Sequence, residues 1–166
     1  MVINGKSLLC ATPIKNMSTQ KNQDNGVSWG LTECGYDIRI KQKVEFLCDN
    51  AGQRKVFVDG KFYDSGRFAL ASAIEEFQMP LNLMGVVHDK STWARQGLSV
   101  FNTIIEPGWE GFLTLELDYK RPGGLLIPAG SGIAQVIFHQ IKNHAEYNGK
   151  YQNQADQPVE AIFLAK

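Results

Sequence analysis

A glutamate in an alternating segment is the first candidate for chemistry. Phe112, Thr114 and Glu116 alternate with leucines at 113, 115 and 117, as in a strand whose two faces differ. If the leucine face fills the core, Glu116 points into whatever the opposite face encloses. A carboxylate in such a pocket can take and return protons when its surroundings raise its pKa toward neutrality. The same pattern fits a surface glutamate on the wet face of a strand, so both interpretations remain open.

A second candidate is the polar segment that runs from Asp89 to Gly97. Asp, Ser or Thr can cap a helix start and Gly97 can end it, which predicts one short helical turn between strands. Lys90, Ser91 and Thr92 at such a start offer a cation, hydroxyls and backbone N–H groups to an anion such as phosphate. The alternative is a solvated polar turn.

Two further segments carry polar groups in unusual settings. Gln135 lies inside the apolar run from Ile133 to Phe138, where its amide needs partners from the backbone or from a ligand. Residues 147–154 combine aromatic, cationic and amide side chains, which suits a lid that closes over a charged small molecule. An ordinary polar tail is the alternative for that segment.

The metal-ligating residues do not form a zinc motif. Cys10, Cys34 and Cys48 include no C-x-x-C pair, which the zinc-dependent nucleobase deaminases require. His139 and His144 are weak candidates for a metal site. The odd number of cysteines predicts reduced thiols in a reducing compartment.

The composition excludes several classes of protein. The chain has 166 residues, with 17 Lys and Arg against 17 Asp and Glu, so it lacks the positive charge of non-specific nucleic-acid binders. Its apolar runs are far shorter than the ~20 residues of a membrane span, and its first residues resemble no signal peptide. We therefore expect a single soluble intracellular domain with neither nucleic acid nor membrane as a partner.

Gly and Pro punctuate the chain between short segments of β type, which predicts a mainly β protein, a barrel or a sandwich. Asp59–Gly60 predicts a hairpin turn between two strands. Residues 16–25 are expected to form a surface loop and residues 143–166 a mobile C-terminal lid. The expected strands are Tyr36–Ile40, Val44–Leu47, Lys55–Val58, Lys61–Tyr63, Gly66–Ser72, Leu98–Asn102, Phe112–Leu117, Leu125–Pro128 and Ile133–His139.

The order of these segments resembles the dCTP deaminase family, which shares its fold with trimeric dUTPases. The segments that carry the resemblance are 27–31 with 35–39, 90–97, 106–111 with 114–117, and 150–154. Asp89 stands where the family commonly has Gly. The resemblance implies a distorted, jelly-roll-like β-barrel (the dUTPase-like β-clip) that assembles as a homotrimer with active sites shared between subunits.

It also implies an activity, the hydrolytic deamination of dCTP to dUTP and ammonia without zinc, by a hydrolase acting on C–N bonds of cyclic amidines. Glu116 would be the general base and acid, and Ser91 and Arg95 would place and polarise the attacking water. Mg²⁺ would be carried by the triphosphate, and the enzyme would be cytoplasmic, in the host cytoplasm if viral. The nucleotide would contact Lys90, Thr92, Glu106, Thr114, Leu115, Gln135, Tyr147, Lys150 and Gln154.

Four alternatives remain within this reading. The chain could be a dUTPase, a bifunctional deaminase and dUTPase that yields dUMP, a deaminase that prefers dCMP, or a non-catalytic trimer that senses nucleotides. A pure dUTPase needs no proton-shuttling glutamate at position 116, and a sensor could lose Ser91, Arg95 and Glu116 together. The presence of all three residues favours the deaminase.

Overall fold

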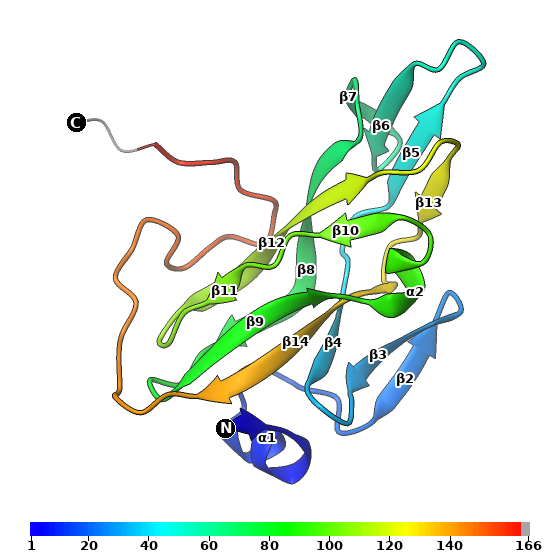
Figure 1. The fold of residues 1–166 in the computed structure, drawn as a ribbon. Helices are drawn as coiled ribbons and strands as arrows, with labels where there is room; N and C mark the ends of the chain where they lie inside the picture. Colours follow the sequence, from blue (N-terminus) through cyan, green and yellow to red (C-terminus); the bar gives the residue numbers. More distant parts are fainter. Residues whose placement is uncertain (164–166) are drawn as a thin grey trace.

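The computed structural model describes residues 1–163, which fold into antiparallel sheets with two short helices (Figure 1). In chain order the elements are β1 (Val2–Ile3), α1 (Gly5–Ala11), β2 (Lys21–Asp24), β3 (Val27–Leu31), β4 (Tyr36–Arg39), β5 (Val44–Cys48), β6 (Arg54–Val58), β7 (Lys61–Asp64), β8 (Phe68–Gln78), β9 (Leu83–Asp89), α2 (Ser91–Ala94), β10 (Leu98–Val100), β11 (Ile104–Ile105), β12 (Glu110–Tyr119), β13 (Leu125–Ile127) and β14 (Gly132–Gln140).

The strands form three sheets. The largest has the order β11-β9-β14-β4-β3-β2, with β1 also paired to β14. The second has the order β10-β12-β8 and the third β13-β5-β6-β7. A bridge between Ile40 and Ala73 joins the first sheet to the second. The fold is therefore mainly β, as expected, but within residues 1–163 no sheet closes on itself into a continuous barrel.

The core lies between the inner faces of these sheets. Along β14, Ala134, Val136 and Phe138 are fully buried, whereas Gln135 and Ile137 between them are partly exposed. This alternation is what a strand with one buried face produces. It puts Gln135 on the outer face of the large sheet, where its register partners are His88 of β9 and Asp37 of β4.

The predicted strands are present, and the predicted hairpin joins β6 to β7. Asp59 and Gly60 have φ values of 51° and 77°, the left-handed conformations that a tight hairpin turn requires. The short helical turn predicted before Gly97 is α2.

The surface loop predicted for residues 16–25 is wrong in its second half, because Lys21–Asp24 forms β2 and pairs with β3. The turn is made by Asn25 and Gly26, with φ values of 52° and 75°. Strand β9 and helix α1 were also not predicted from the sequence.

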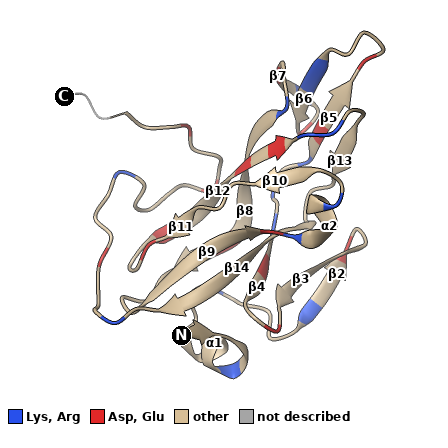
Figure 2. Cartoon of the chain, in the orientation of Figure 1, with Lys and Arg blue, Asp and Glu red and all other residues tan. Residues whose placement is uncertain are grey.

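Basic and acidic residues are spread along the chain over many of its elements (Figure 2). Within the described residues, no helix is long and apolar enough to cross a membrane. Residues 143–163 of the predicted lid run as irregular chain beside the second sheet (orange to red in Figure 1), and residues 164–166 lie outside the described part.

Candidate functional site

One face of β12 packs in the core, and the other face lines a cavity. Leu115 and Leu117 are 1% and 0% exposed and belong to the core, while Thr114 and Glu116 face a cavity. The register of β12 against β8 shifts between Phe112 and Thr114, where β8 carries the extra residues, and Leu113 at this point also lines the cavity. The predicted orientation of Glu116 is therefore observed.

The cavity has a volume of about 440 Å³, within the range of pockets that hold small ligands. Strands β8 and β12 form one part of its wall, the loop around β11 another, and the C-terminal segment a third. The lining residues are Phe68, Leu70, Thr103, Ile104, Ile105, Glu106, Trp109, Leu113, Thr114, Glu116, Tyr147, Tyr151, Gln154, Val159, Glu160 and Ala161.

Burial raises the pKa of the Glu116 carboxyl above its usual value. Desolvation disfavours the charged form of a carboxyl group, which moves it toward the range in which it can both take and give a proton near neutral pH. The described lining contains three carboxylates, of Glu106, Glu116 and Glu160, and neither lysine nor arginine. Such a wall suits a neutral group that offers hydrogen-bond donors better than it suits a phosphate.

The C-terminal segment is attached to this wall mainly by backbone groups. Gly111 forms a parallel bridge with Gln154, and Nε1 of Trp109 donates to the Tyr151 carbonyl at 2.6 Å. A Cβ on Gly111 would lie 2.5 Å from the Gln154 nitrogen. Only glycine at position 111 therefore lets the segment approach so closely.

Farther along, the segment contacts groups that we expected to bind nucleotide. The Val159 N–H donates to Oγ1 of Thr114 at 3.0 Å. Lys150 donates to the Ile162 carbonyl, and the Ile162 N–H donates to the Tyr151 hydroxyl at 3.1 Å. The described part of the lid thus lies over the cavity in this structure.

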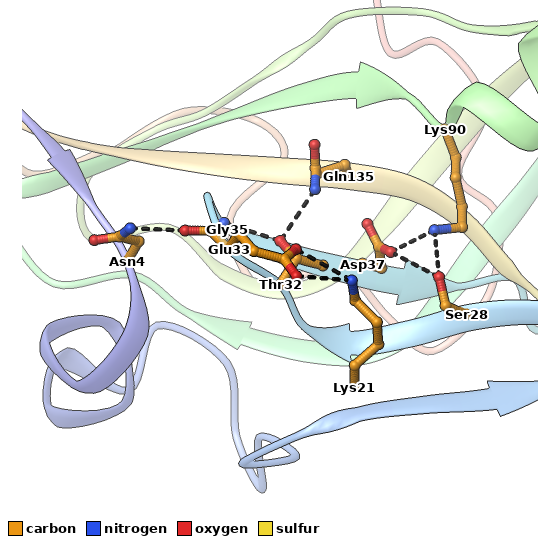
Figure 3. A network of polar contacts seen from close by, with 9 residues as sticks. All are labelled: Asn4, Lys21, Ser28, Thr32, Glu33, Gly35, Asp37, Lys90 and Gln135. Atoms are coloured by element: carbon orange, nitrogen blue, oxygen red, sulfur yellow. Dashed lines mark hydrogen bonds and ion pairs between the residues drawn. The ribbon is translucent and has the colours of Figure 1, made fainter.

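A second group of predicted residues lies outside the cavity lining. Ser91, Thr92 and Arg95 are exposed on and beside α2. Lys90 forms an ion pair with Asp37, and its ammonium also donates to Oγ of Ser28 at 3.0 Å (Figure 3). Burial raises the pKa of Asp37 although Lys90 opposes the shift.

Gln135 belongs to this second group. Its amide donates to Oγ1 of Thr32 at 3.0 Å (Figure 3), so the partner that the sequence left open is a protein side chain here. Asp89, the departure from the family pattern, accepts a hydrogen bond from the Val100 N–H at 2.7 Å. Its carboxylate therefore fastens β10 to the end of β9.

The structure thus divides the predicted site residues into two groups. Glu106, Thr114, Glu116, Tyr147 and Gln154 line one cavity, whereas Lys90, Ser91, Thr92, Arg95, Gln135 and Lys150 are not among its lining residues. Leu115 has its side chain in the core, so only its main chain is free to meet a ligand. No group of three or more His, Cys, Asp or Glu side chains within residues 1–163 is arranged to hold a metal ion.

The sequence reading missed several cavity residues. Thr103 lies in a segment that carried no signal for a pocket, and Leu113 lies at the irregularity between β12 and β8. Val159 and Glu160 reach the wall only because the C-terminal segment folds back on the sheet. Tyr151 belongs to the predicted lid, residues 147–154, although it was not named as a site residue.

Comparison with known proteins places the chain in a family. A sequence model described as "dCTP deaminase-like" matches residues 14–141. A protein named dCTP deaminase from Protochlamydia amoebophila is 35% identical over 154 residues, which span 81% of this chain and 80% of the relative.

Solved structures share the fold at low identity. The dCTP deaminase from Agrobacterium tumefaciens matches with a TM-score of 0.53 and 15% identity, over 82% of this chain and 47% of that one. The native EIAV dUTPase matches with a TM-score of 0.52 and 18% identity, over 80% of this chain and 92% of that one. Because the family model spans most of the described fold, the chain belongs to the dCTP deaminase-like family.

Proposed function

We propose that this protein is an enzyme that deaminates dCTP hydrolytically to dUTP and ammonia, with Glu116 as general base and acid. The observation that carries the proposal is the Glu116 carboxyl, which faces a cavity of about 440 Å³ and whose pKa is raised by burial. The names of the relatives at about one third identity support the choice of dCTP.

The reaction can proceed by acid–base steps in a closed pocket. The ionised Glu116 takes a proton from a water molecule while the water oxygen bonds to C4 of cytosine, and the same proton passes to N3. Glu116 then moves the second proton of the former water to the amino nitrogen, the C4–N bond breaks, and ammonia leaves. The product ring carries a carbonyl at C4 and a proton at N3, so water and dCTP balance dUTP and ammonia.

Ser91 and Arg95 would place and polarise the water, because a guanidinium stays charged and stabilises developing hydroxide without taking a proton. Both residues are exposed and absent from the cavity lining of their own chain. We therefore propose a homotrimer in which Ser91 and Arg95 of one subunit complete the cavity of the next. A closed symmetric assembly would repeat this shared site at every interface.

The remaining contacts follow from where the polar groups lie. Glu106 in the cavity lining would meet the 3′-hydroxyl of the deoxyribose, and Thr114 with the Leu115 main chain would meet base and sugar. Tyr147 and Gln154 would close the same site from the lid. Thr92, Gln135 and Lys150 would bind the phosphates. Mg²⁺ would be bound by the phosphates, and the proposed reaction would use no zinc. The three cysteines, all within the described residues, are free thiols, which fits a cytoplasmic enzyme.

A product assay tests the proposal. The protein is incubated with dCTP and Mg²⁺, and the nucleotides are separated by chromatography, with dCMP and dUTP as parallel substrates. We expect dUTP and ammonia from dCTP. Formation of dUMP from dCTP would indicate the bifunctional enzyme, and conversion of dUTP alone would indicate a dUTPase. Absence of turnover on every cytosine nucleotide would refute the deaminase.

A further inference from the structure

The helical turn that carries Ser91 and Arg95 is not stable without contacts to the rest of the protein. Helix α2 has only four residues and no side-chain cap at its start, and a single helical turn is unstable without outside contacts. Ser91, Thr92 and Arg95 are exposed and contribute little packing. The contacts that fix this turn must therefore come from its buried residues and from neighbouring strands.

Besides the exposed Arg121, which donates to the Arg95 carbonyl at 3.4 Å, three less exposed contacts surround α2. Nε1 of Trp93 donates to the Gly132 carbonyl at 2.7 Å, and the Asp89 carboxylate accepts from the Val100 N–H. The third contact is the ion pair between Lys90 and Asp37, just before Ser91 (Figure 3). Two of the three reach other strands of the large sheet, so the sheet determines where the turn lies.

The ion pair is also largely shielded from solvent. The side chains of Lys90 and Asp37 are 10% and 4% exposed, and Oγ of Ser28 bonds to both of them, donating to Asp37 at 3.5 Å. A charge this buried is tolerated only when it is paired and hydrogen-bonded. The Lys90 ammonium therefore points into the protein, toward Asp37 and Ser28.

Gly132 brings the parts of this arrangement together. A Cβ on Gly132 would lie 2.0 Å from the Ser28 carbonyl oxygen, so the backbones of β3 and β14 touch at this point. The same glycine receives the Trp93 hydrogen bond. Ser28, Gly132 and α2 are thus packed directly on one another, and a shift of Ser28 would move the turn.

We propose that Asp37 is a positioning residue that acts through Lys90 to fix Ser91 and Arg95 for the attack on the base. The proposal rests on the proposed function for its catalytic readout. It replaces the expected role of Lys90 as a phosphate ligand with an internal one. A positioning pair affects the rate of the chemical step, whereas a phosphate ligand mainly affects the KM of dCTP.

The chain offers a matched control on the same strand. Arg39, two residues after Asp37, pairs with Glu75 of β8, and the Glu75 side chain is also 4% exposed. Oε2 of Glu75 accepts from the Arg39 N–H at 2.8 Å. Glu75→Gln therefore weakens a comparable buried ion pair on β4 without touching α2.

The experiment compares Asp37→Asn, Lys90→Met, the double variant, Lys90→Arg and Glu75→Gln in the dCTP assay, with thermal unfolding measured for each. We expect Asp37→Asn and Lys90→Met each to lower kcat by about tenfold or more with little change in KM. The double variant should be no slower than the slower single variant, because one pair acts as a unit. Lys90→Arg should retain most of kcat, and Glu75→Gln should lower Tm yet keep kcat.

Defined results would overturn the proposal. A raised KM with unchanged kcat in Lys90→Met would show that Lys90 is a phosphate ligand. If Glu75→Gln lost as much kcat as Asp37→Asn, general destabilisation would explain the loss in both variants. If Asp37→Asn does not fold, Ser28→Ala provides the milder disturbance of the same pair and is expected to lower kcat in the same direction.

Hydrogen exchange separates this proposal from the proposed function. Asp37→Asn should accelerate amide exchange in residues 91–97, and Glu75→Gln should leave exchange there unchanged, whether or not the protein acts on dCTP. Unchanged exchange in Asp37→Asn would refute the positioning role, while an inactive wild-type protein would refute only the deaminase.

Discussion

The main-chain N–H of Val159 donates a hydrogen bond to the side-chain oxygen of Thr114, 45 residues earlier in the chain, at 3.0 Å. This bond joins the C-terminal segment to the strand that carries Glu116, two residues away from the proposed catalytic carboxyl. A hydroxyl group that the resemblance assigned to the nucleotide is therefore one of the groups that hold the segment over the cavity. In the proposed complex, the same hydroxyl would have to bond to both the lid and the nucleotide.

Thr114→Val should loosen the segment, because valine keeps the shape of threonine and removes the acceptor. Loss of one such bond is worth about 1 kcal/mol, or roughly a fivefold faster exchange of the Val159 amide. Hydrogen exchange with mass spectrometry measures this change. Thr103→Val, a matched change elsewhere in the cavity wall, should leave exchange at Val159 as in the wild type. Equal exchange in the two variants would show that the bond does not hold the segment.

Glu116→Gln should lower the rate of dCTP deamination by about a hundredfold or more, the usual effect of losing a general base. Nucleotide binding, measured by calorimetry, should change little, because the amide keeps the size of the carboxyl. Glu110→Gln on the same strand, outside the described cavity lining, should stay close to the wild-type rate. A Glu116→Gln variant with a normal rate would place the base elsewhere.

The raised pKa of Glu116 predicts opposite effects of pH on stability and on catalysis. The folded protein holds this proton more tightly than the unfolded chain, so ionisation destabilises the fold as pH rises through the raised pKa. Glu116→Gln cannot ionise, and its Tm should therefore exceed that of the wild type at about pH 8 and match it at about pH 4. The rate of deamination should rise with pH across the same range, because the base must be ionised. A Tm difference that is the same at both pH values would contradict the shift.

Gly111→Ala should detach the C-terminal segment, because the new Cβ would lie 2.5 Å and 2.7 Å from backbone atoms of Gln154. We expect faster limited proteolysis of residues 143–163 and a lower rate with dCTP. Gly123→Ala is the matched control, since Gly123 also has a positive φ, of 95°, but has open space around it. If both variants were cleaved equally fast, backbone strain and not contact with Gln154 would be the cause.

Two inactive variants should complement each other if the site is shared. Glu116→Gln and Ser91→Ala are mixed after mild denaturation and reassembled. A site that takes Glu116 from one subunit and Ser91 from the next would be intact in about one quarter of random combinations, so about one quarter of the activity should return. Light scattering should show three chains, and an unmixed control should remain inactive. No recovery in a mixed trimer would mean that each subunit builds its own site.

The orientation of Glu116 could be predicted from the sequence because alternation along a strand is a local property. The same holds for the Asp59–Gly60 turn, whose residue types demand a particular backbone. Strand β2 was missed because its residues are polar, although Asn25–Gly26 gave the same turn signal. Short-range patterns were thus sufficient where a few neighbouring residues determine the structure.

The long-range partners could not be predicted in this way. Lys90 and Asp37 are 53 residues apart, and nothing near Lys90 in the sequence distinguishes an internal ion pair from a phosphate ligand. Gln154 and Val159 make their contacts through main-chain atoms, so the types of their own side chains do not predict these contacts. The division of the site into two groups of residues follows from the way the sheets pack, which a motif does not encode.

The contact between Gly132 and the Ser28 carbonyl also predicts the result of a mutagenesis screen. A random-mutagenesis screen for loss of deamination would score position 132 together with the catalytic positions, although glycine contributes no functional group. Any larger residue there would force β3 away from β14 and disturb the support of Ser91 from a distance. A position of this enzyme that does not tolerate substitution could therefore support the site structurally without taking part in catalysis.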